Sequence, residues 1–64
     1  MIGIGDCITL DNDKWHDAGK KYYVLKISYR PNSTAVDLVL EDENDNIFHR
    51  TESVHALVLV EEND

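Results

Sequence analysis

The sequence TAVDLVLEDENDNIFHRT, residues 34–51, contains two apolar runs separated by six consecutive polar residues, 41–46. In the first run every second residue from Val36 to Leu40 is apolar, and this period of two is typical of a strand with one buried face. With Glu41 as the end of the first strand, the connection is residues 42–46, which are Asp, Glu and Asn. Asn and Asp tolerate the left-handed backbone angles of tight turns. With a short strand at 47–51, the stretch predicts a β-hairpin.

Three further short apolar runs lie outside this hairpin, and turn residues bound each of them. They are residues 7–10, 21–29 and 57–60. Five short strands with turn signals between them are typical of a small all-β barrel or sandwich. The polar residues 11–20 are too few for a stable helix, so we expect a long surface loop there.

A single helical turn is expected before the last strand. Thr51 or Ser53 can cap one turn of α- or 3₁₀-helix within residues 51–55. The chain is long enough for one domain only. We place that domain at residues 1–60, followed by an acidic tail at residues 61–64.

The order of these motifs resembles the small SH3-like barrels of the KOW and Tudor type. The chain begins with Gly5-Asp6-x-Ile8-x-Leu10, continues through a long loop and three meander strands, and ends with Val54-x-x-Leu57-x-Leu59. The resemblance implies an all-β fold, a five-stranded antiparallel SH3-like barrel with one short helical turn before the last strand. It extends to the fold only, because the aromatic groove, aromatic cage and basic surface of those families are absent from the sequence.

Tracing alternate residues along each run predicts the core. Along residues 21–29 the more apolar face holds Tyr23, Leu25, Ile27 and Tyr29, so we expect it to point inward and the face with Tyr22, Val24, Lys26 and Ser28 to point outward. The predicted core residues are Ile8, Leu10, Leu25, Ile27, Val36, Leu38, Leu40, Phe48 or Ile47, Val54, Leu57 and Leu59.

Cysteine content and charge indicate the cellular setting. The one cysteine, Cys7, cannot form an internal disulfide, whereas small secreted domains usually carry several. We therefore expect a cytoplasmic protein with neither a signal peptide nor a membrane span. The net charge of −7 is uneven: residues 14–30 hold five of the six basic residues, and residues 37–64 hold nine acids.

The sequence favours a binding protein over an enzyme. The three histidines and Cys7 lie at no zinc-type spacing. The acidic loop from residue 11 departs from the calcium-binding pattern at its fifth position, a tryptophan, and the loop from residue 42 departs at the glycine and glutamate positions. Cys7 lies within a strand, where an inert buried thiol is the usual role. No glycine-rich phosphate loop is present. We expect no cofactor, no metal and no catalytic residue.

Two groups of residues are candidate partner-binding sites. The first is an aromatic and basic patch beside the long loop, and an alternative for its tryptophan is a plug at one end of the barrel. The second is an acidic ridge that would dock on a basic partner protein. The patch comprises Trp15, His16, Tyr22 and Lys26; the ridge comprises Asp37, Glu41, Asp42, Glu43 and Asp45.

These sites predict a small, acidic, non-enzymatic protein-interaction module. Its size and charge resemble those of the phage and mobile-element inhibitors that imitate nucleic acid, an analogy rather than a motif. The alternative is a nucleic-acid-binding barrel that uses the Lys- and Tyr-rich second strand, although the net charge of −7 opposes it. Homodimers are a further expectation, because the edge strands of so small a sheet can pair between chains.

Overall fold

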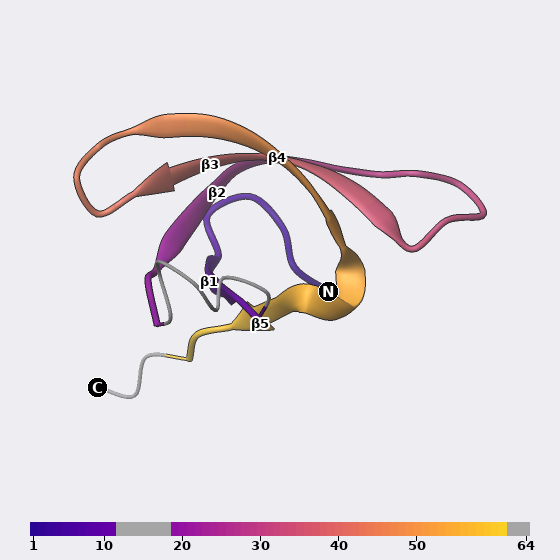
Figure 1. Cartoon of the computed structure of the whole chain (residues 1–64), viewed down its shortest axis with the longest axis horizontal. Helices are drawn as coiled ribbons and strands as arrows, with labels where there is room; N and C mark the ends of the chain where they lie inside the picture. Colours follow the sequence, from indigo (N-terminus) through magenta and orange to yellow (C-terminus); the bar gives the residue numbers. More distant parts are fainter. Residues whose placement is uncertain (12–18, 62–64) are drawn as a thin grey trace.

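A computed structural model describes residues 1–11 and 19–61 of the chain. It has a single antiparallel sheet of five strands in the order β4-β3-β2-β1-β5 (Figure 1). A 3₁₀ turn, η1, connects β4 to β5. The elements are β1 (Cys7–Leu10), β2 (Tyr22–Tyr29), β3 (Ala35–Asp42), β4 (Ile47–Ser53), η1 (Val54–Ala56) and β5 (Leu57–Leu59).

The all-β class, the five antiparallel strands and the helical turn are confirmed. Ser53 caps η1 as expected, since its hydroxyl accepts a hydrogen bond from the backbone N–H of His55 at 3.2 Å. The sheet is not closed, because β4 and β5 form its two edges, and it therefore does not confirm a barrel. Within residues 1–11 and 19–61, η1 is the only helical element, and its three residues are far too few to cross a bilayer.

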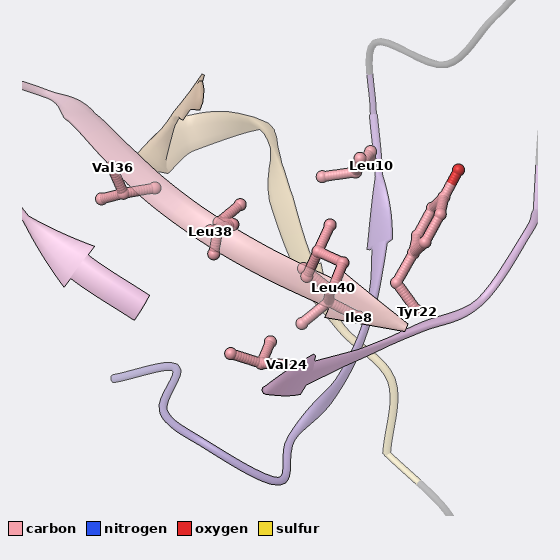
Figure 2. Packing of buried hydrophobic residues seen from close by; sticks show 7 residues of the cluster. All are labelled: Ile8, Leu10, Tyr22, Val24, Val36, Leu38 and Leu40. Carbon is pink, nitrogen blue, oxygen red and sulfur yellow. The ribbon is translucent and has the colours of Figure 1, made fainter. Parts of the chain in front are cut away.

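The hydrophobic core lies on one face of β1, β2 and β3, which we call the inner face (Figure 2). Ile8 and Leu40 are fully buried, and a ring of partly buried side chains packs around the cluster. The buried residues are Ile8, Leu10, Tyr22, Val24, Val36, Leu38 and Leu40, and the partly buried ones are Ile2, Ile27, Phe48, Val54 and Leu57. Most of the predicted core is therefore confirmed, and of the alternatives at β4 the inward residue is Phe48.

The predicted face of β2 is wrong over its first half. Tyr22 and Val24 are each 1% exposed, whereas Tyr23 and Leu25 are each 40% exposed. The cause is a β-bulge. Val24 pairs with Leu40 on β3, and Lys26 pairs with the adjacent Val39. Leu25 therefore lies between them as an extra residue with no counterpart on β3. A bulge shifts the side-chain alternation by one residue. Beyond it, Ile27 lies on the inner face as expected.

The predicted burial of Leu59 is also wrong, because its side chain is 47% exposed on β5. This short strand pairs only with β1, and its other edge meets no strand among the described residues. Leu57, at the start of β5, is the residue of this strand that packs against the core.

The N-terminal segment extends the pairing of β2. The backbone N–H of Gly5 donates to the carbonyl of Val24 at 2.8 Å, and the N–H of Val24 donates to the carbonyl of Asp6 at 3.0 Å. Gly5 has a φ of 91°, in the left-handed region that favours glycine. The hydroxyl of Tyr29 donates to the carbonyl of Ile2 at 2.7 Å. These bonds hold Ile2 against the core.

The bulge makes two leucines non-equivalent. Leu38→Ala removes a side chain that is 2% exposed and should lower the free energy of unfolding by about 2–5 kcal/mol. Leu25→Ala, the matched control, removes a half-exposed side chain and should lower it by about 1 kcal/mol or less. Urea unfolding followed by circular dichroism measures both values. Equal losses would contradict the bulged register of β2.

Candidate interaction surface

The predicted aromatic and basic patch is divided between the two faces of β2. Tyr22 lies in the core, where its ring meets that of Phe48 edge-on, with centroids 5.5 Å apart and planes at 82°. Lys26 lies beyond the bulge and pairs with Val39 on the side of the sheet opposite the core. We call this side the outer face. Tyr22 is therefore a core residue and offers no surface to a partner. Trp15 and His16 lie outside the described residues.

One predicted ridge residue, Asp42, stabilises the β3–β4 turn instead. Its carboxylate is 4% exposed and accepts hydrogen bonds from the backbone N–H groups of Asn44 and Asn46, each at 2.9 Å. The side-chain amide of Asn46 donates a third bond at 3.2 Å, and the Lys20 ammonium lies 3.4 Å away. These bonds, above all those from Asn46, lower the pKa of Asp42 to about 2. Asp45 adopts a φ of 64°, which Asp tolerates.

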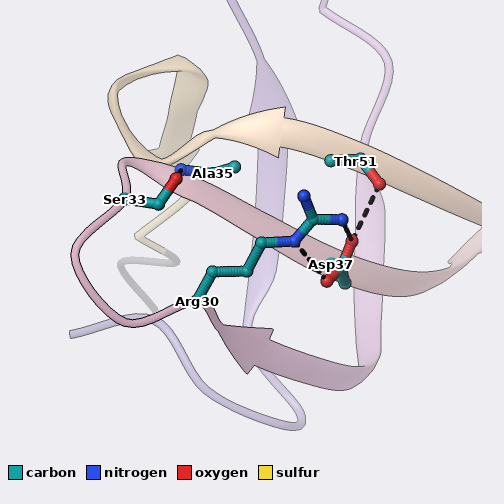
Figure 3. A network of polar contacts seen from close by, with 5 residues as sticks. All are labelled: Arg30, Ser33, Ala35, Asp37 and Thr51. Carbon is teal, nitrogen blue, oxygen red and sulfur yellow. Dashed lines mark hydrogen bonds and ion pairs between the residues drawn. The ribbon is translucent and has the colours of Figure 1, made fainter.

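A second ridge residue, Asp37, is neutralised by a basic neighbour (Figure 3). Arg30 donates to it from Nε at 2.9 Å and from a terminal nitrogen at 2.8 Å, while the Thr51 hydroxyl donates a third bond at 2.8 Å. The hydrogen bond from Arg30 is the main reason that the pKa of Asp37 is lowered. Asp37 thus adds little negative charge to the surface.

The remaining ridge residues gather at the β3–β4 turn. Glu43 and Asp45 are exposed and Glu41 is partly exposed, and none of the three forms an ion pair within residues 1–11 and 19–61. We call Glu43 and Asp45 the acidic turn. Of the five predicted ridge residues, the structure therefore leaves three carboxylates available to a partner.

A shallow hollow of about 260 Å³ lies on the outer face of the sheet. One row of three paired residues lines this hollow: Val39 on β3 pairs with Lys26 on β2 and with His49 on β4. Ser28 and the neutralised Asp37 line its far end. Lys26 and His49 are exposed, and neither has a hydrogen-bond or ion-pair partner in the part of the chain that the structure describes. We call Lys26, Val39 and His49 the basic row.

Sequence reasoning missed His49 as part of this surface. The signal was available in the hairpin itself: on β3, Val39 lies between two inward leucines and so points outward, and the hairpin pairing brings His49 beside it. No three His, Cys, Asp or Glu side chains come together as metal ligands among the described residues.

Comparison with known proteins adds no family to this description. No protein-family model matches the chain, and no curated protein or solved structure is significantly similar to it.

The lowered pKa of Asp42 predicts an acid-dependent stability. The carboxyl has an ordinary pKa of 3.8 when unfolded and about 2 when folded. Its contribution to the free energy of unfolding is thus complete above pH 3.8 and is lost as the pH falls towards 2. Urea unfolding at a series of pH values measures this loss.

Asp42→Asn is the matched variant, because an amide oxygen can still accept the turn N–H bonds but does not titrate in this range. It should be less stable than the original chain at neutral pH, and the difference should shrink as the pH falls towards 2. A difference that stays constant with pH would contradict the role assigned to the Asp42 charge.

Proposed function

We propose that the protein is a small, non-enzymatic, cytoplasmic interaction module that docks through its acidic turn on a basic surface of a partner protein. The observation that carries this proposal is the structure of the turn. Asp42, buried beneath it, accepts three hydrogen bonds from residues 44–46. Glu43 and Asp45 are exposed to solvent, and neither forms an ion pair within residues 1–11 and 19–61.

A turn ordered in this way is suited to binding. Because its backbone is already held by hydrogen bonds, less conformational entropy is lost when a partner docks. The net charge of −7 attracts a basic partner over a distance and raises the rate of encounter. The proposal therefore predicts fast, salt-sensitive association with a protein that presents lysines or arginines.

The partner class that best fits these charges is a basic protein that handles nucleic acid. The two carboxylates of the acidic turn would occupy the places of phosphates on the partner's surface. This is the inhibitor role, of the phage or mobile-element type, that the size and charge of the chain suggest by analogy. The fold we propose for it is the SH3-like one, which the strand order and the turn η1 support.

Neutralising the acidic turn tests this function. Glu43→Gln with Asp45→Asn removes two charges, and Asn tolerates the positive φ of position 45. Asp11→Asn with Glu61→Gln, the matched control, removes two exposed charges elsewhere. Partners are captured from native lysate, identified by mass spectrometry and then purified for affinity measurement.

The turn variant should bind the purified basic partner at least about tenfold more weakly, while the control should change the affinity far less. Equal weakening by both variants would mean that overall charge alone drives association. Recovery of no basic partner, even at low salt, would contradict the proposal.

The second candidate function is nucleic-acid binding through β2. Lys21, Tyr23 and Lys26 are exposed, so a stacking ring lies between two cations along the chain. If this function holds, single-stranded DNA or RNA should bind with an affinity that falls as salt rises. Lys21→Glu with Lys26→Glu should then abolish binding in a fluorescence anisotropy assay. Absence of salt-dependent binding by the original chain would exclude this candidate.

A further inference from the structure

Two neighbouring rows of side chains on the outer face are complementary in charge. The first is the basic row, which crosses the hollow. The second lies one step nearer the β3–β4 turn, where Glu41 pairs with Tyr23 on β2 and with Ile47 on β4. We call Tyr23, Glu41 and Ile47 the acidic row. On β3 and β4 the two rows are about 7 Å apart, since side chains of one face recur at every second residue.

The acidic row is open to contact. Tyr23 is 40% exposed and Ile47 is 60% exposed, so an aromatic and an aliphatic side chain flank the carboxylate of Glu41. That carboxylate has no hydrogen-bond or ion-pair partner in residues 1–11 and 19–61. The basic row has the matching features: two unpaired nitrogen-bearing side chains, Lys26 and His49, on either side of Val39.

We propose that two copies of the chain pack outer face to outer face, about a twofold axis that runs across the strands between the two rows. This axis places the acidic row of each copy on the basic row of the other. Glu41 of one copy then enters the hollow between Lys26 and His49 of the second copy. Because the axis is twofold, every contact occurs twice, and one self-complementary patch completes the interface.

The neighbouring contacts are also favourable. Tyr23 of one copy lies over Lys26 of the other, an arrangement in which an ammonium group is attracted to an aromatic face. Ile47 of one copy packs beside His49 of the other and covers apolar surface. The hollow of about 260 Å³ gives the Glu41 side chain room to enter.

The charge of the chain favours this face over the rest of the surface for self-association. Two copies that each carry −7 repel each other overall. On the outer face, however, Lys26 offsets Glu41, and Arg30 offsets Asp37 through a two-bonded ion pair. The acidic turn lies beyond Glu41 and stays outside the proposed interface, so this proposal does not depend on the proposed function.

Reciprocal charge reversal tests the interface. Sedimentation equilibrium of the full chain should show a monomer that becomes a dimer as the protein concentration rises. Lys26→Glu and Glu41→Lys each place like charges opposite one another at both symmetry-related contacts, and each should raise the dimer dissociation constant at least about tenfold. The double variant, Lys26→Glu with Glu41→Lys, restores opposite charges and should recover most of the dimer.

Glu61→Lys is the matched control, because it changes the net charge as Glu41→Lys does at an exposed position after β5. It should not raise the dissociation constant. Circular dichroism shows whether each variant is folded, and the double variant has the same net charge as the original chain. A monomer at all concentrations, a dimer indifferent to both single reversals, or a double variant that stays monomeric would each overturn the proposal.

Discussion

The extra residue in β2 determines which side chains of this protein are buried. Val24 and Ile27 both lie on the inner face, although their odd separation would place them on opposite faces of a regular strand. Leu25 is an extra, unpaired residue between them, and it shifts the alternation so that Ile27 points to the inner face. The bulge lies beyond Tyr22 and Tyr23, the two residues of β2 that pair with β1, and within the longer pairing of β2 with β3.

The outer face depends on the same bulge. Once Tyr22 and Val24 turn inward, Tyr23 must point outward, and beyond the bulge Lys26 points outward as well. The row of Tyr23 and the row of Lys26 thus become neighbours on one surface. In a regular strand these two side chains would lie on opposite faces, and the complementary rows would not exist.

Some of the thirteen acidic side chains form hydrogen bonds or ion pairs that hold the fold together. Asp42 holds the β3–β4 turn, Asp37 is paired with Arg30, and Glu52 is paired with Arg50 at 2.7 Å. The Arg50–Glu52 pair lies on the inner side of the edge strand β4, opposite Leu38 and Val36. Inward charges on an edge strand discourage the addition of further strands.

The sequence by itself determined the strands, the turn between β3 and β4, the cap of η1 and the inward face of β3. All of these follow from local rules of alternation and turn chemistry, which act over a few residues. The exposure of Glu43 and Asp45 was predictable for the same reason. Only the tertiary structure decided the face of β2, the burial of Tyr22 and Asp42, and the neutralisation of Asp37. Each of these depends on a residue brought close by strand pairing or by a bulge, and alternation along one strand contains no information about either.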